Sequence, residues 1–128
     1  MRLLLDTHVL IWMAYQPERL TPKGRRMLHL VENELVFSVV SLWEIGVKRA
    51  LGRKDFNFDP HILRGELLVR GFRELQVTGE HALAVAQLPE LHRDPFDRLL
   101  LCQALVEGLT LLSNDDVVLQ YPVTVLRV

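Results

Sequence analysis

Short apolar runs alternate along the chain with longer segments in which apolar residues recur at helical spacing. The short runs are rich in Leu, Val and Phe and bounded by polar residues, as in buried strands. They lie at residues 3–5, 34–40, 75–77, 109–112 and 123–126. Helices are predicted from about 7–16, 22–31, 42–51, 60–70, 79–88 and 95–107. This alternation predicts an α/β fold, a three-layer α/β/α sandwich with a mostly parallel sheet.

Acidic residues stand at the predicted starts of three helices. Asp6 directly follows the first apolar run, and its own neighbourhood favours a helix N-cap. Ser41 and Glu44 have the spacing of a capping box, in which each side chain bonds the backbone amide of the other residue. Asp94 precedes Pro95 and is therefore predicted to cap the helix whose first turn contains Asp97. Capping alone would explain each of these positions.

The composition is that of one compact domain, assigned to residues 1–128. Hydrophobic residues make up 49% of the chain, and the formal net charge is −1, so the bulk charge gives no general attraction to nucleic acid or to an anionic membrane. No apolar run is long enough to span a membrane or to form a signal peptide, which favours the cytoplasm. Cys102 lies within an apolar segment and is expected to be a buried thiol without a functional role.

The predicted parallel sheet suggests a second role for the acids besides helix capping. Asp6 and Asp115 follow apolar strands, whereas Glu44 and Asp97 lie in the first turns of helices. In a parallel sheet these positions share one rim, so the four carboxylates are predicted to face one cleft. Two such charges about 5 Å apart repel by roughly 3 kcal/mol at an effective dielectric constant of 20, more than the ~1 kcal/mol of a helix cap. A divalent cation would offset this repulsion, and carboxylate ligands favour Mg²⁺ or Mn²⁺. Such a site suits attack of water on a phosphodiester.

Four segments together resemble the PIN-domain ribonucleases, in particular the VapC-type toxins of toxin–antitoxin pairs. They are residues 3–8 (LLLDTH), 41–45 (SLWEI), 92–100 (HRDPFDRLL) and 111–115 (LLSND). The resemblance implies a PIN-like fold and a catalytic, metal-binding set of Asp6, Glu44, Asp97 and Asp115. It also implies a Mg²⁺- or Mn²⁺-dependent endoribonuclease, a cognate antitoxin protein that inhibits it, and a homodimer.

Further residues are expected around this set. The resemblance places Thr7 and Ser113 beside the site, bonded to acids, water or phosphate. Asp115 is preferred to Asp116 as the fourth acid because it follows Ser-x, as the family pattern requires. Asp116 and the helix cap Asp94 are expected to lie next to the metal ligands rather than to bind the metal themselves. Arg93 and Arg98 flank Asp97, and at least one is predicted to contact RNA phosphate, the alternative being an ordinary salt bridge.

The remaining candidates have simpler explanations. Lys48 lies one turn after Glu44, where an i,i+4 ion pair explains it. Trp12 and Trp43 are predicted to belong to the core, and the five histidines show no zinc-binding spacing. The alternative function is a non-catalytic PIN-like module that binds protein or RNA, and the repulsion among four retained acids argues against it. A nuclease of structured DNA would need a more basic surface.

Overall fold

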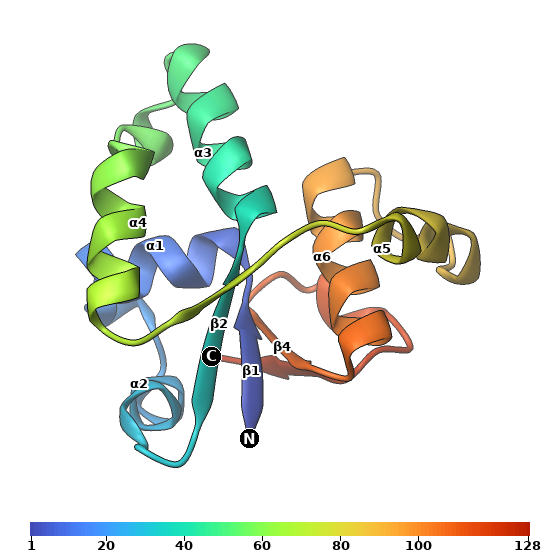
Figure 1. Ribbon diagram of the computed structural model, residues 1–128, viewed down its shortest axis with the longest axis horizontal. Coiled ribbons are helices and arrows are strands. Elements are labelled where there is room, and N and C mark those ends of the chain that lie inside the picture. Colours follow the sequence, from blue (N-terminus) through green and yellow to red (C-terminus); the bar gives the residue numbers. More distant parts are fainter.

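The computed structural model describes all 128 residues, and a five-stranded sheet forms its centre (Figure 1). The strands are β1 (Arg2–Leu5), β2 (Glu34–Ser38), β3 (Arg73–Leu75), β4 (Thr110–Ser113) and β5 (Val125–Arg127). Their order in the sheet is β3-β2-β1-β4-β5, and each neighbouring pair is parallel. The predicted α/β fold with a parallel sheet is thereby confirmed.

Helices cover both faces of this sheet. They are α1 (Thr7–Tyr15), α2 (Pro22–His29), α3 (Val39–Ala50), α4 (Pro60–Val69), α5 (Gly79–Leu83) and α6 (Pro95–Glu107). Figure 1 shows α1, α2 and α4 on one side of the sheet and α5 and α6 on the other. Short 3-10 helices occupy Pro17–Arg19, Lys54–Phe56, Ala84–Gln87 and Val118–Gln120.

Strand β1 supplies both apolar cores, because successive side chains of a strand point to opposite faces. Leu3 and Leu5 belong to the cluster beneath α1, α2 and α4, whereas Leu4 belongs to the cluster beneath α5 and α6. All three are fully buried. The apolar run of residues 3–5 is therefore continuous because its strand is the central one of the sheet and is covered on both sides.

The prediction was wrong about where α3 begins. Val39 and Val40, read as the end of a strand, are the first helical residues, and the N-cap is Ser38, whose Oγ accepts from the Val40 amide at 3.0 Å. A serine cap at the end of β2 ends the strand pattern there despite the β-branched pair. Consequently Ser41 and Glu44 form no capping box but lie inside the helix.

Smaller boundary shifts affect the outer elements. Strand β3 covers Arg73–Leu75 rather than 75–77, β5 covers Val125–Arg127, and the helix predicted at 79–88 divides into α5 and a 3-10 turn. Helix α2 ends at His29. Burial of Cys102 is confirmed, and Trp12 packs against the core. Trp43 does not, because it faces outward from α3 and is 65% exposed.

Parallel pairing brings the carboxyl ends of β1, β2 and β4 to the same edge of the sheet. Helix α1 begins one residue beyond β1, and α3 follows β2 without a loop, so both helices start at this edge (Figure 1). None of the helices is both long enough and apolar enough to cross a lipid bilayer.

Candidate metal centre and active site

One cavity of about 560 Å³ opens at this edge, and the four acids singled out from the sequence line it. Asp6 reaches it from the end of β1, Glu44 from α3, Asp97 from α6 and Asp115 from the segment after β4. Residues more than 100 positions apart in the chain thus meet because their strands pair in parallel.

Asp6 is both a helix cap and a cavity residue. Its Oδ1 accepts from the amide of Val9 at 2.9 Å, which caps α1 as the sequence predicts. Its own amide donates to the carbonyl of Leu112 at 3.0 Å, which fixes the backbone between β1 and β4. Only 5% of the residue is exposed. One carboxylate oxygen therefore serves the helix, and the other is available to the cavity.

Glu44 is almost completely buried, with 1% of its surface exposed. Its Oε2 lies 2.5 Å from the Nζ of Lys48, which confirms the predicted i,i+4 ion pair. The other oxygen, Oε1, is buried and has no hydrogen-bond partner. A buried carboxylate oxygen without a partner is costly, so this atom lacks a hydrogen-bond donor or a positive group to compensate its burial.

The start of α6 presents a third group of ligands. Asp94 caps the helix, since its Oδ1 accepts from the amides of Phe96 at 2.8 Å and Asp97 at 3.3 Å. His92, Asp94 and Asp97 can each offer one ligand atom such that these atoms all lie within 4.8 Å of one another. Asp94, predicted as a helix cap next to the metal ligands, thus caps α6 and also has an oxygen within 4.8 Å of a ligand atom of Asp97.

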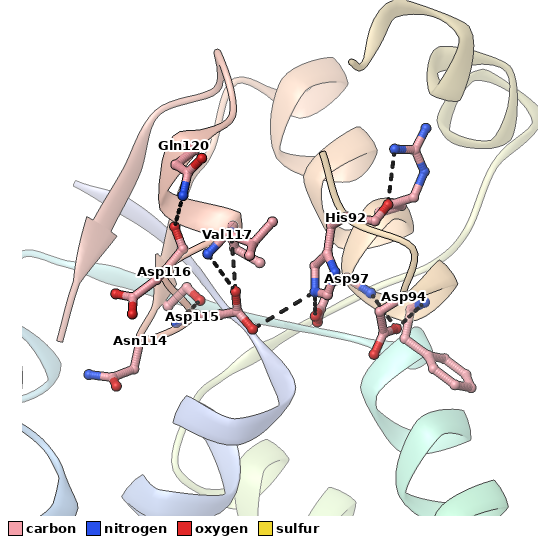
Figure 2. Close-up of polar contacts among 12 residues, drawn as sticks. His92, Asp94, Asp97, Asn114, Asp115, Asp116, Val117 and Gln120 are labelled. Atoms are coloured by element: carbon pink, nitrogen blue, oxygen red, sulfur yellow. Dashed lines mark hydrogen bonds and ion pairs between the residues drawn. The ribbon is translucent and has the colours of Figure 1, made fainter. Parts of the chain in front are cut away.

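His92 is a site residue that sequence reasoning missed. Its Nε2 lies 2.8 Å from Oδ2 of Asp97 and 3.8 Å from Oδ2 of Asp115, so the imidazole stands between two of the acids (Figure 2). Its place two residues before the helix cap Asp94 was the available signal. A single histidine outside any ligand spacing gave no reason to use it.

The structure distinguishes Asp115 from Asp116. Oδ1 of Asp115 accepts hydrogen bonds from the backbone amides of Val117 at 2.8 Å and Val118 at 3.1 Å and so caps the turn that follows. Its other oxygen, Oδ2, faces His92. Asp116 points away from the cavity (Figure 2), pairs with Arg127, and has a side chain that is 83% exposed. The geometry therefore favours Asp115 as the fourth acid.

The two hydroxyl residues expected beside the site are both buried there. The Thr7 hydroxyl donates to the hydroxyl of Ser41 at 3.0 Å, which ties α1 to α3. The Ser113 hydroxyl accepts from the amide of Asp115 at 3.1 Å and bonds the carboxyl of Asp6. Ser113 therefore contacts acids, whereas Thr7 contacts another hydroxyl.

The two arginines that flank Asp97 lie outside the cavity lining. Arg93 is exposed. Arg98 donates to the carbonyl of Pro89 at 3.0 Å and to the hydroxyl of Tyr121 at 3.1 Å. The same hydroxyl accepts from the amide of His92 at 2.7 Å. Arg98 is thus engaged in holding the loop that carries His92.

Burial and mutual repulsion set the charge of the site. Burial raises the pKa of Asp6 to about 6, although hydrogen bonds from Ser113 and Val9 oppose the shift. Burial also raises the pKa of Asp97 to about 7, reinforced by the charges of Asp94, Asp6 and Glu44 and opposed by the bond to His92. Both carboxyls would ionise more readily beside a cation.

The donor set fits a hard divalent cation. Six carboxylates line the cavity: Asp55 and the five of Asp6, Glu44, Asp94, Asp97 and Asp115, and Lys48 is paired with Glu44 and Asp94. Lys48 leaves Oε1 of Glu44 without a partner, and burial raises the pKa values of Asp6 and Asp97, so a cation would favour the charged form of both. Carboxylate oxygens in this number are typical ligands of Mg²⁺ and Mn²⁺.

The sequence profile of the PIN domain matches residues 3–123. This span includes all four acids. No curated protein sequence gives a significant match.

Several solved structures share the fold across the whole chain. A VapBC2 complex from Rickettsia felis, bound to a promoter DNA fragment, matches with a TM-score of 0.74 and 15% identity, covering 100% of this chain and 99% of that one. The DNA-bound VapBC of Salmonella typhimurium has a TM-score of 0.67 and 16% identity, with coverage of 99% and 98%. VapBC-1 of nontypeable Haemophilus influenzae has a TM-score of 0.63 and 22% identity, with coverage of 94% and 91%.

Proposed function

Since this chain belongs to the PIN-domain family, we propose that it is a divalent-metal-dependent endoribonuclease whose active site is the acidic cavity. The observation that carries the proposal is that four carboxylates, from β1, α3, α6 and the segment after β4, line one cavity, and that one of them, Glu44, has a buried oxygen without a partner. A protein that only bound a partner would have no use for this repulsion.

Asp6, Glu44, Asp97 and Asp115 would hold the cation. When bound, Mg²⁺ or Mn²⁺ supplies a Lewis acid that lowers the pKa of water and neutralises charge on phosphoryl oxygens. The chain's own residues orient these ligands: Val9 and Ser113 hold Asp6, and His92 stands between Asp97 and Asp115. Lys48 holds Oε2 of Glu44, and the unpartnered Oε1 would be the oxygen of this residue that could bind the cation.

The biological role that agrees with this chemistry is that of a VapC-type toxin. The support is the fold shared with VapBC complexes over 94–100% of this chain. The proposed toxin acts on RNA in the cytoplasm, forms a homodimer and is neutralised by a cognate antitoxin protein. A short reading frame for a DNA-binding head and a disordered tail, next to the gene, is the expected companion.

Cleavage of RNA by the purified chain tests the proposal. The protein should cut RNA with Mg²⁺ and not with EDTA, and Asp6→Asn or Asp97→Asn should reduce the rate at least about 100-fold, as expected when a metal ligand is lost. Asp115→Asn should act alike, whereas Asp116→Asn, which changes an exposed carboxylate outside the cavity, is the matched control. Undiminished cleavage in both the Asp6 and Asp97 variants would refute the site.

Absence of cleavage with any divalent metal, together with retained binding of RNA or protein, would favour the alternative of a non-catalytic PIN-like module.

A further inference from the structure

The cavity that holds the acids also has a cationic side. Arg19, Arg53 and Lys54 line it, and all three residues are exposed. They come from two 3-10 elements: Arg19 ends Pro17–Arg19, and Lys54 begins Lys54–Phe56, directly after Arg53. We refer to Arg19, Arg53 and Lys54 as the cationic track.

Most of the positive charge of the track is not neutralised by acids. Arg53 lies 3.6 Å from Asp55, whose other oxygen is 3.9 Å from His8. Arg19 bonds only the neutral amide of Gln16, at 3.3 Å, and Lys54 enters no ion pair. Two of the three cations are therefore free to bind an anion.

Aromatic rings connect the members of the track. The guanidinium of Arg19 lies over the Trp12 ring, 4.7 Å from its centroid, and that of Arg53 is 5.7 Å from the centroid of Phe56. The exposed imidazole of His8 stands between, 6.0 Å from Trp12 and 5.4 Å from Phe56. Phe56 is buried, so the rings that a base could reach are those of Trp12 and His8, which line the cavity. Cations next to such rings are typical of surfaces that bind the phosphates and unpaired bases of single strands.

Lys48 contacts both Phe56, beside the cationic track, and Glu44, one of the acids. The Nζ of Lys48 lies 4.8 Å from the centroid of Phe56 and 2.5 Å from Oε2 of Glu44. A polyanion brought to the six carboxylates of the cavity meets strong repulsion, and local cations are needed to hold its backbone there, since the net charge of the chain is −1.

We propose that Arg19, Arg53 and Lys54 bind phosphates of a single-stranded RNA next to the bond that the acids would cleave. The inference rests on the proposed function only in naming RNA as the occupant. It assigns phosphate contacts to residues that line the cavity, which Arg93 and Arg98 do not. An acidic peptide is the competing occupant, and the rings beside the cations favour RNA.

Binding of a fluorescein-labelled 12-nucleotide oligouridylate, followed by fluorescence anisotropy in EDTA over a range of NaCl concentrations, tests the inference. Replacing Arg19, Arg53 and Lys54 together by Gln should weaken binding by about tenfold or more and reduce the salt slope by about 2, the value for three phosphate contacts of a single strand. The matched control replaces Lys23, Arg25 and Arg26 of α2, three exposed cations outside this cavity, and should change binding little.

Equal weakening in both triple variants, no weakening in the track variant, or no binding by the unmodified chain would overturn the inference. So would a labelled hexaglutamate peptide that binds more tightly than the oligonucleotide and loses affinity in the track variant. The single variants Arg19→Gln and Lys54→Gln, each expected to lose part of the affinity, repeat the test if the triple variant unfolds. Because EDTA prevents metal-dependent cleavage, track-dependent binding by a chain that cleaves no RNA would refute the proposed function and leave this inference standing.

Discussion

The imidazole of His92 and the carboxyl of Asp97 are in direct contact, with Nε2 2.8 Å from Oδ2. This bond lowers the pKa of Asp97, which burial and the neighbouring acids raise to about 7. We predict that His92→Ala raises the pKa of Asp97 further, because it removes a hydrogen bond to the charged carboxylate. The acid limb of kcat/KM for RNA cleavage with Mg²⁺ should then move to higher pH.

The control for this prediction is His29→Ala, which changes an exposed histidine of α2. An acid limb that stays in place in the His92 variant would show that His92 does not act on Asp97.

The raised pKa values of Asp6 and Asp97 also predict how stability depends on pH when no metal is bound. A carboxyl whose pKa is higher in the folded than in the unfolded state stabilises the fold at low pH, and this contribution is lost as pH rises through the folded pKa. The two groups therefore favour the fold below pH 4 and lose that contribution between about pH 4 and 7.

Thermal unfolding of the chain, first stripped of metal and then measured in buffer without chelator, checks this directly. Between pH 5 and pH 8, the Tm of Asp97→Asn, whose side chain cannot ionise, should fall less than the Tm of the unmodified chain. Added Mn²⁺ should raise the Tm of the unmodified chain more at pH 8 than at pH 5. Equal pH dependence in variant and parent would contradict the assignment.

The hydroxyl of Tyr121 holds the loop that precedes α6. It accepts from the amide of His92 at 2.7 Å and from Arg98 at 3.1 Å. Tyr121→Phe keeps the ring and leaves both donors without this partner, so we expect a loss of about 1–3 kcal/mol in the free energy of unfolding. Tyr15→Phe is the control, because that exposed tyrosine stacks on Phe58 and its hydroxyl makes no hydrogen bond. Urea unfolding of both variants measures the difference.

Alanine substitutions at two helical glycines should change the free energy of unfolding in opposite directions. A Cβ on Gly24 of α2 would lie 2.7 Å from Cβ of Val128 and 3.0 Å from its Cα, so Gly24→Ala forces α2 away from the end of the chain. A Cβ on Gly46 of α3 meets nothing within 4 Å. We expect Gly24→Ala to lower the unfolding free energy by about 1–3 kcal/mol and Gly46→Ala to raise it by about 0.5–1 kcal/mol. Calorimetric Tm values that moved in the same direction would contradict this packing.

The sequence predicted the elements whose start is fixed by local chemistry. Asp6 and Asp94 were read as helix caps, and both cap α1 and α6 in the structure. The start of α3 was misplaced because Ser38 and Ser41 are both suitable caps and the valines between them suit a strand as well as a buried helix. Local propensity could not decide between the two serines.

The candidate site, too, could be predicted only in part from the sequence. That Asp6, Glu44, Asp97 and Asp115 share a cavity followed from the parallel sheet, since strand ends meet at one edge. The neighbours of the acids depend on side-chain packing between distant elements, which no spacing in the chain records. His92 and the cationic track became visible only once the loop before α6 and the turn after α3 were placed.

Exposure of Trp43 has a similar origin. The hydrophobic character of Trp43 predicts burial wherever α3 begins. The direction in which this side chain points depends instead on how α3 packs against α6. The ring meets Phe96 edge to face, with centroids 5.4 Å apart, and leaves its other face open.

Calorimetric titration of Mn²⁺ into the purified chain at pH 8 tests the central claim most directly. We expect saturable binding that Glu44→Gln weakens at least about tenfold, because this substitution removes the charge of the buried carboxylate whose Oε1 has no partner. Asp116→Asn should bind as the parent does. Absence of binding at millimolar Mn²⁺, or equal binding by the parent and the Glu44 variant, would contradict a metal centre in this cavity.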